Sequence, residues 1–553
     1  MLATSMSMTR ESRRTTPTCG TPWMSNVPTL NGSTGVMSVW AEAGTAQASA
    51  TNRPSIRVRR ITLLLCESDP LRECGCTPGA PGCQGGRASN PYTEQMRRAS
   101  VATACGAVCV LALLVTPRLV TGQAAETARS VVLFVGDGVD DHQLTIARNY
   151  LLGADGVFVF ETFEHQAAAK VLTVLEADPR VPEYVGDSAS GGTAIAAGVV
   201  TSRGRIATRA GTGEPVPTLL ELAAGAGKRT GIVTTSSVTD ATPASFVAHI
   251  GGRFCEGPSD MLPTPTDPRC PDDLKARGGA GSIAEQLAVS GVDVLLGGGY
   301  EYFDQPDEAG VSVLHRAREA GYRIVRGPAG LREAEGDSGP ILGLFGDGTL
   351  PVEWVGEGGS RARPVQVTAA GQVIAPEPFR CVENPDFGSR PTLEAMTRSA
   401  LTRLESAPTG FFLMVESASI DKQAHRGDPC GQIGETRALD QAVRVAVAFQ
   451  ERHPDTLILV ASDHGHAAQI VPWPSLFAAR RSDAQYPPGK VARLRTLEGG
   501  LMAVSYGTNT HYLEEHTGTQ VPVYAQGPGA AAVRGLIRQS DLFRIVRRAL
   551  ALE

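Results

Sequence analysis

Four short apolar segments, each followed by an acidic residue, constrain the fold of this chain most strongly. The segments cover 131–135, 231–235, 411–415 and 457–461, and the acidic residues after them are Asp137, Asp240, Glu416 and Asp463. Continuously apolar runs of this length, separated by helical patterns, are typical of parallel strands that are buried on both faces. The sequence therefore predicts an α/β fold with a doubly wound, mostly parallel central sheet flanked by helices, and with loop insertions near the rim of the active site.

Helical patterns are expected between these strands, over 206–227 and 437–452. The stretch 300–380 is rich in Gly, Pro and acidic residues. We expect it to contain a helix over 313–320, a strand near 341–345, and loops at the active-site rim or at an oligomer contact.

The acidic residues after the strands indicate a metal site. In a doubly wound sheet, ligands gather outside the carboxyl ends of the strands, so Asp137, Asp240, Glu416 and Asp463 are expected to meet in one crevice. Taken alone, each would be an ordinary solvated loop carboxylate. Crowded carboxylates repel one another, and bound cations are the usual means of neutralising them.

Histidines lie close to the same acidic residues in the sequence. Asp421 and His425 are four residues apart and share one face if their segment is helical. His464 and His466 follow Asp463, and His516 precedes an expected strand over 521–525. Mixed imidazole and carboxylate ligands suit zinc.

Overall charge argues against a nucleic-acid partner. The chain has 51 basic and 57 acidic residues and a formal net charge of −6. It therefore lacks the basic field that would attract a polyanion.

The N-terminal part differs in composition from the rest. Residues 1–95 show no sustained apolar period and are interpreted as a disordered extension or a misassigned start. Residues 96–124 combine a basic head, an apolar run over 101–115 and small residues near a cleavage point, which indicates a signal peptide. A membrane anchor is the alternative, but the run is shorter than the roughly 20 residues that span a bilayer. We therefore expect a catalytic domain over 125–553, a periplasmic or secreted location, and no stable membrane anchor.

Cysteine usage agrees with export. Seven of the 11 cysteines precede residue 125, which leaves Cys255, Cys270, Cys381 and Cys430. Four cysteines permit three pairings. Because Cys255 and Cys270 bracket a loop rich in Pro and Asp, we expect the pairs 255–270 and 381–430. A zinc cluster is the competing interpretation, although no two of the four have the C-x2-C spacing.

Seven motifs occur in order along the chain. They are GDG at 136–138, DSA at 187–189, TDATPA at 239–244, HIGGR at 249–253, VESASIDKQAH at 415–425, SDHGH at 462–466 and EHTG at 515–518. Together they resemble secreted bacterial alkaline phosphatases, and the likeness runs from Val131 to Leu552. GSIAEQL at 281–287 and PCGQIGE at 429–435 add to it.

The resemblance implies three metal ions with named ligands. One zinc is expected at Asp421, His425 and His516, with His466 supporting a zinc ligand from outside. The second zinc is expected at Asp137, Asp463 and His464. A magnesium ion would share Asp137 and add Thr242 and Glu416, with Asp240 close by, and this oxygen-only set suits a hard ion.

The resemblance also implies the catalytic residues. Ser188 would be the nucleophile, Arg253 would bind phosphate, Asp187 would orient Arg253, and Lys422 would reach phosphate through water. The residues after Ser188 fit a helix whose N-terminus favours phosphate oxygens. Ser190 is also available as a nucleophile, Ser188 has an alternative role as a helix cap, Arg253 as a surface ion pair, and Lys422 as a solvent-facing residue.

The expected function is hydrolysis of phosphate monoesters at alkaline pH through a phosphoserine, with broad specificity and release of inorganic phosphate. The resemblance also implies a homodimer. A phosphodiesterase or sulfatase of the same superfamily is one alternative. A phosphate-binding protein that has lost catalysis is another, from a different functional class.

Overall fold

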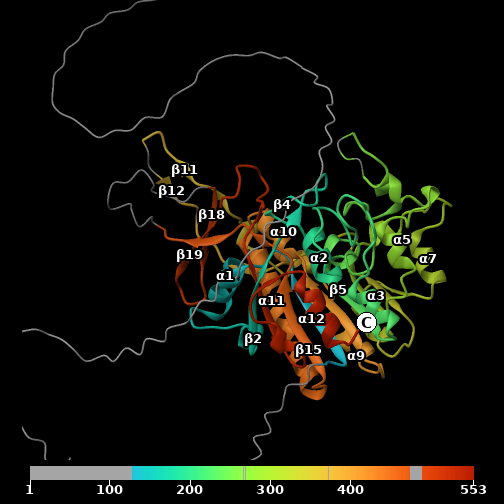
Figure 1. Cartoon of the computed structure of the whole chain (residues 1–553). Helices are drawn as coiled ribbons and strands as arrows, with labels where there is room; N and C mark the ends of the chain where they lie inside the picture. Colours follow the sequence, from blue (N-terminus) through green and yellow to red (C-terminus); the bar gives the residue numbers. More distant parts are fainter. Residues whose placement is uncertain (1–126, 266, 268, 371–372, 474–488, 553) are drawn as a thin grey trace, which may run out of the picture. The chain divides into compact units, whose positions relative to one another are not determined.

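The computed structural model describes residues 127–265, 267, 269–370, 373–473 and 489–552 (Figure 1). By internal contacts the chain divides into units 1–111 and 112–553, and every described residue belongs to the second unit. The expected extension over 1–95 and the expected signal peptide over 96–124 lie outside the described residues.

A sheet of 10 strands forms the centre of the described unit. In spatial order its strands are β22 (Gly535–Arg538), β2 (His165–Lys170), β21 (Val521–Gln526), β15 (Thr456–Ser462), β1 (Ser130–Gly136), β14 (Phe411–Ser417), β5 (Arg229–Ser237), β6 (Val294–Gly298), β8 (Ile341–Leu344) and β7 (Arg323–Val325). All neighbouring pairs are parallel except those of β21, which runs antiparallel to both β15 and β2. The four predicted central strands and the mostly parallel sheet are confirmed.

The sheet is buried on both faces because alternate residues of its strands enter two separate cores. In β1, Val131, Leu133 and Val135 belong to one core, whereas Val132 and Phe134 belong to the other. Strand side chains alternate between the two faces of a sheet, so an uninterrupted apolar run fills both cores at once.

Helices cover both faces of the sheet. On the Val131 face lie α2 (Ser188–Ala197), α3 (Leu219–Gly225) and α12 (Asp541–Ala549). On the Phe134 face lie α1 (Asp141–Leu152), α9 (Leu393–Leu404) and α11 (Pro429–Arg452). These two layers confirm the doubly wound architecture, and all six helices are labelled in Figure 1.

The two helices predicted from the sequence differ in extent from those in the structure. The helix predicted over 206–227 is too long, and the one predicted over 437–452 is too short. Of 206–227, only α3 is helical, because glycines 211 and 213 adopt positive φ and Thr218 caps a new helix. The preceding segment instead forms a short bridge between Thr208 and Pro215. The predicted helix over 437–452 is real, but it is the end of α11, which begins at Pro429.

The stretch 300–380 contributes strands to the main sheet and to a second sheet. It contains α6 (Tyr300–Phe303), α7 (Val313–Glu319), α8 (Pro328–Ala334), β7, β8, β9 (Trp354–Gly356), β10 (Arg363–Pro364), β11 (Gln366–Val367) and β12 (Val373–Ile374). The expected helix and strand are α7 and β8. A second sheet has the order β10, β18 (Lys490–Arg495), β19 (Leu501–Tyr506) and β17 (Gln469–Val471).

The remaining helices and strands are short. They are α4 (Ala241–Ala244), α5 (Ile283–Ala288), α10 (Ser419–His425), β3 (Thr173–Val174), β4 (Pro182–Glu183), β13 (Cys381–Glu383), β16 (Gly465–His466) and β20 (His516–Thr517). The GSIAEQL motif forms the start of α5, where Ser282 and Glu285 make a reciprocal capping box.

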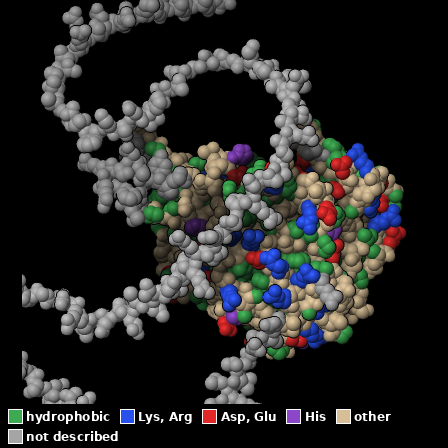
Figure 2. Space-filling model, in the orientation of Figure 1, with side chains coloured by type: hydrophobic (Ala, Val, Ile, Leu, Met, Phe, Trp, Pro, Cys, Tyr) green, Lys and Arg blue, Asp and Glu red, His purple; other side chains and the backbone are tan. Residues whose placement is uncertain are grey.

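Both expected disulfides are present, Cys255–Cys270 and Cys381–Cys430. Among the described helices, none is both long and apolar enough to cross a membrane. On the face drawn in Figure 2, several basic side chains gather in the lower middle, whereas acidic and basic side chains are mixed toward the right edge.

Candidate active site

The carboxyl ends of three adjacent strands bring three acidic residues together. Asp137 follows β1, Asp463 follows β15, and Glu416 is the penultimate residue of β14. Because β1 lies between β14 and β15 and pairs with both in parallel, these residues reach the same end of the sheet. Their exposed fractions are 2%, 0% and 1% respectively, so they are buried carboxylates rather than solvated loop residues.

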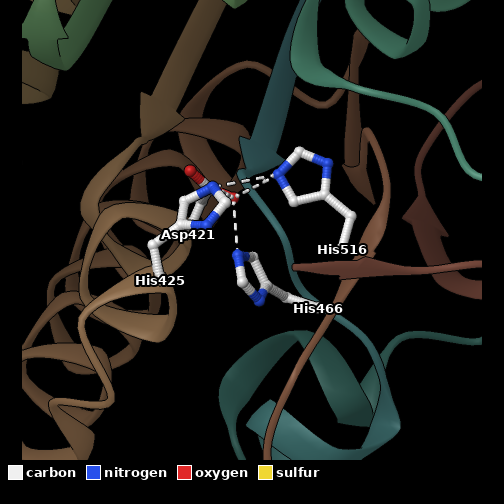
Figure 3. A group of neighbouring side chains, drawn as sticks. All are labelled: Asp421, His425, His466 and His516. Atoms are coloured by element: carbon white, nitrogen blue, oxygen red, sulfur yellow. Dashed lines mark hydrogen bonds and ion pairs between the residues drawn. The ribbon is translucent and has the colours of Figure 1, made fainter. Parts of the chain in front are cut away.

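Asp421, His425 and His516 form a group that we call the helix-loop cluster (Figure 3). Helix α10 places Asp421 and His425 one turn apart, and β20 begins at His516. The Nε2 atoms of His516 and His425 lie 3.1 Å and 3.5 Å from Asp421 Oδ1. Together with His466, these residues offer ligand atoms that all lie within 4.8 Å of one another.

Backbone carbonyls fix the tautomers of His425 and His516. Nδ1 of His425 lies 2.5 Å from the carbonyl oxygen of Glu514, and Nδ1 of His516 lies 2.9 Å from that of Gly186. Since a carbonyl can only accept, each Nδ1 carries a proton and each neutral ring keeps its Nε2 lone pair free. Histidines that bind metals are oriented in this way.

His466 has the opposite tautomer. Its Nδ1 accepts a hydrogen bond from the N–H of Ala467 at 2.7 Å, so in the neutral ring the proton is on Nε2. That atom lies 3.2 Å from Asp421 Oδ1. Burial lowers the pKa of His466 to about 4, which keeps the ring neutral. In this tautomer His466 offers no Nε2 lone pair to an ion, and neither its Nε2 nor Asp421 Oδ1 has a hydrogen-bond partner in the described part of the chain.

Asp137, Asp463 and His464 form a second group, which we call the strand-end cluster. Nε2 of His464 lies 3.4 Å from Asp137 Oδ1 and 3.6 Å from Asp463 Oδ2. Nδ1 of His464 lies 3.3 Å from the carbonyl oxygen of Gly465, so this ring also keeps its Nε2 lone pair free.

The electrostatics of the strand-end cluster favour a cation. Burial raises the pKa of Asp137, and the neighbouring charges of Asp463 and Asp421 raise it further. Burial also raises the pKa of Asp463, to about 6, and lowers the pKa of His464. A divalent ion between these groups would offset the repulsion between the carboxylates and would bind the neutral imidazole.

Thr242 and Glu416 provide oxygen donors for a hard ion. Thr242 Oγ1 is buried and makes no hydrogen bond within the described part of the chain. Glu416 accepts hydrogen bonds from Thr234 and Ser236, and burial, followed by the charge of Asp240, raises its pKa to about 7. An unpaired buried hydroxyl and a buried carboxylate are oxygen donors of the kind that Mg²⁺ prefers.

Ser188 lies against the strand-end cluster. Its Oγ is 3.3 Å from His464 Nε2 and 3.5 Å from Asp137 Oδ1. It is the first residue of α2, which Asp187 caps by accepting the N–H of Ser190. A Cβ atom at Gly191 would lie only 2.3 Å from the carbonyl oxygen of Asp463, so glycine allows the start of α2 to approach the cluster.

Arg253 and Lys422 bring positive charge to the same place. Arg253 contacts Asp187 Oδ2 at 3.1 Å and Asp240 Oδ1 at 3.2 Å, and Lys422 Nζ lies 2.5 Å from Asp240 Oδ2. Burial alone would raise the pKa of Asp240, but the charges of Lys422 and Arg253 outweigh it and lower the pKa. Both cations are thus tied to Asp240, and Arg253 is also tied to Asp187, the residue before Ser188. Positive charge held in this way would attract phosphate oxygens.

Two carboxylates near the site, the buried Glu435 and the half-buried Glu256, were not predicted from the sequence. Glu435 accepts from Thr235 Oγ1 at 2.9 Å and Ser417 Oγ at 3.1 Å, directly behind the turn that joins β14 to α10. Glu256 accepts from Thr239 Oγ1 at 2.6 Å. The position of Glu435 in the PCGQIGE motif was a signal for it, whereas no motif indicates Glu256.

The fold and the two clusters define an α/β protein with two candidate metal sites, and comparison with known proteins shows its family. The family model for alkaline phosphatase matches residues 128–512. The chain therefore belongs to the alkaline phosphatase family and is a phosphomonoester hydrolase.

Several relatives support this conclusion. The chain is 44% identical over 464 residues to a streptomycin-6-phosphate phosphatase of Streptomyces griseus, covering 81% of this chain and 97% of the relative. It is 39% identical over 433 residues to the alkaline phosphatase of Escherichia coli, covering 77% and 87% respectively. The solved alkaline phosphatase of the Antarctic bacterium TAB5 has the same fold, with a TM-score of 0.57 at 22% identity over 77% of this chain and 99% of that one.

Proposed function

We propose that this enzyme hydrolyses phosphate monoesters at alkaline pH through a phosphoserine formed on Ser188, with two zinc ions and one magnesium ion as cofactors. The contact of Ser188 Oγ with the strand-end cluster is the observation that carries the proposal. The three carbonyl-anchored imidazoles and the unpaired hydroxyl of Thr242 fit the metal ions.

The division of the ligands between the ions follows the family resemblance, and the donor types agree with it. Asp421, His425 and His516 would hold one zinc. Asp137, Asp463 and His464 would hold the other, and Thr242 and Glu416 would join Asp137 at magnesium. When bound, these ions supply positive charge that lowers the pKa of a nearby hydroxyl and stabilises the attacking and leaving oxygens.

The protein's own residues bind and orient the substrate. Arg253 donates to phosphate oxygens from a guanidinium that Asp187 and Asp240 hold in place. Ser188 Oγ attacks phosphorus. The bond between phosphorus and the alcohol or phenol oxygen, on the opposite side, then breaks. Water then attacks the phosphoserine, releases inorganic phosphate and restores the serine.

Substrate comparison tests the proposal. We expect faster turnover of p-nitrophenyl phosphate at alkaline pH than of its bis-ester or sulfate analogues. Faster hydrolysis of the diester or the sulfate would favour the alternative enzyme classes. Bound phosphate without turnover would favour a catalytically inactive phosphate-binding protein.

A narrower substrate, a phosphorylated aminoglycoside, is a second candidate. The observation that favours it is the 44% identity to the streptomycin-6-phosphate phosphatase over nearly all of that relative. A kcat/KM for streptomycin 6-phosphate at least about tenfold above that for p-nitrophenyl phosphate would support it, since tenfold corresponds to about 1.4 kcal/mol of transition-state binding. Equal values would support broad specificity.

Export and dimerisation belong to the same proposal. The two disulfides and the basic-then-apolar pattern over 96–124 support a signal peptide and a mature catalytic domain over 125–553 in the periplasm or outside the cell. N-terminal sequencing of the exported protein tests the cleavage point. Light scattering tests whether it is the homodimer that the family resemblance implies.

A further inference from the structure

The loop over 507–515, which joins β19 to β20, contains one buried carboxylate. Glu514 is 0% exposed, whereas the other residues of this fully described loop are partly or fully exposed. A carboxylate loses hydration on burial, and this cost must be offset by hydrogen bonds or an ion pair.

Glu514 ties the loop to the second sheet. Its Oε1 lies 2.9 Å from Nζ of Lys490 on β18, and its Oε2 accepts from the N–H and Oγ1 of Thr508 at 3.1 Å and 2.9 Å. Lys490 Nζ also donates to the carbonyl oxygen of Tyr512 at 2.9 Å. The side chain of Glu514 therefore fixes both the start and the end of the loop.

The backbone of Glu514 reaches the helix-loop cluster. Its N–H donates to the carbonyl oxygen of His425 at 2.8 Å, and its carbonyl oxygen accepts from His425 Nδ1 at 2.5 Å. His516 lies two residues further on, with Nε2 3.1 Å from Asp421 Oδ1. One loop position thus sets the tautomer of one histidine and the location of another.

We propose that Glu514, held by Lys490, is a positioning residue that sets the zinc affinity of the helix-loop cluster. The inference rests on the proposed function, which places a zinc ion there. Neither side chain touches the ion or the substrate. They act through the loop, whose carbonyl keeps the proton of His425 on Nδ1 and whose end carries His516.

A purely stabilising role explains this arrangement less well. Replacing a buried ion pair by apolar groups often costs little or even stabilises a fold, so such a pair is weak support for a stability role. The second-shell partners of metal ligands, in contrast, typically change metal affinity by about 10- to 100-fold when they are removed.

The test measures zinc dissociation constants by competition with a chromophoric chelator in the full enzyme. Glu514→Gln and Lys490→Met should each weaken zinc binding at the helix-loop cluster by about tenfold and leave zinc binding at the strand-end cluster unchanged. The double variant should bind zinc no more weakly than the more impaired of the two single variants, because the two residues act as a unit. Lys490→Arg, which keeps the positive charge, should retain the wild-type zinc affinity. Glu515→Gln, at the exposed neighbouring carboxylate, is the matched control.

A second readout separates positioning from stability. Cobalt substituted at the same cluster should show a changed visible spectrum in Glu514→Gln and Lys490→Met but not in Glu515→Gln. Affinities and spectra equal to those of the control, with only a lower Tm, would overturn the inference. If Glu514→Gln does not fold, Lys490→Met decides the question alone. A wild-type enzyme that binds no zinc would overturn the proposed function itself.

Discussion

The two clusters differ in how the fold builds them. The strand-end cluster comes from the ends of adjacent strands, and its side chains are between 0% and 3% exposed. The helix-loop cluster is gathered from a short helix and a loop, and its side chains are between 7% and 28% exposed. The sheet itself therefore preorganises one cluster, whereas the other depends on backbone contacts made by the loop.

The largest expected effect concerns the nucleophile beside the strand-end cluster. Ser188→Ala should lower kcat by at least about 10³-fold, because only slow direct attack by water would remain. Trapping of radiolabelled phosphoenzyme at acid pH measures the intermediate, which should be absent. Ser190→Ala is the matched control and should still form it. Phosphoenzyme in the Ser188 variant and none in the Ser190 variant would reverse the assignment.

Removing one ligand from each cluster should show that the clusters are independent. His516→Ala should lose one zinc equivalent, and Asp463→Asn should lose the other, with kcat lowered about 100-fold or more in each variant. Metal analysis per subunit, combined with kinetics, measures both effects. Full zinc content in either variant would reject that ligand assignment.

Chelator treatment should distinguish the clusters by rate. Because His425 is 28% exposed and His464 is 0% exposed, the ion of the helix-loop cluster should leave at least about tenfold faster. Stopped-flow release into a chromophoric chelator should therefore show two phases. A single phase would show that the two clusters release their ions at the same rate, which contradicts this prediction.

The smallest effect concerns Glu435, which lies behind the turn between the clusters. Burial raises its pKa to about 7 from an ordinary value of 4.5. Below pH 4.5 the folded and unfolded states both hold the proton. As pH rises toward 7 the folded state keeps a proton that the unfolded state loses, so this group opposes folding increasingly until about pH 7.

Glu435→Gln cannot titrate, so its free energy of unfolding relative to wild type should rise between pH 4.5 and 7. The gain should reach roughly 3 kcal/mol at most, since one pKa unit corresponds to about 1.4 kcal/mol. Urea unfolding at pH 5 and pH 8 measures it. Glu451→Gln, on the exposed face of α11, should show no such rise. If the free energies of unfolding of Glu435→Gln and wild type differ by the same amount at both pH values, the raised pKa of Glu435 is contradicted.

The sheet and the strand-end cluster were predictable because both follow from local patterns. A continuous apolar run implies a strand buried on both faces, and the residue after such a strand lies at the carboxyl edge whatever the rest of the chain does. The same reasoning found Asp137, Glu416 and Asp463. Seven ordered motifs, read as a family resemblance, supplied Ser188 and the remaining ligand assignments.

What the sequence did not reveal depends on contacts between distant segments. Helix 206–227 was overpredicted because the apolar pattern extends across two glycines that adopt positive φ. Glu514 looks like a surface residue in its loop, and only the approach of Lys490 from the neighbouring strand β18 shows why it is buried. Tautomers likewise follow from which carbonyl reaches a ring, and a sequence does not contain that information.

Three imidazoles in this enzyme are oriented by main-chain oxygens rather than by side chains. A main-chain oxygen is present whichever amino acid occupies its position. A substitution at 186, 465 or 514 would thus keep the acceptor atom itself. At two of these positions other contacts still restrict the residue: a Cβ at Gly465 would lie 2.3 Å from Thr519 Cγ2, and Glu514 also acts through its side chain. Directed evolution of substrate preference can consequently randomise rim side chains freely, while insertions or deletions in these segments should be far more damaging than point substitutions.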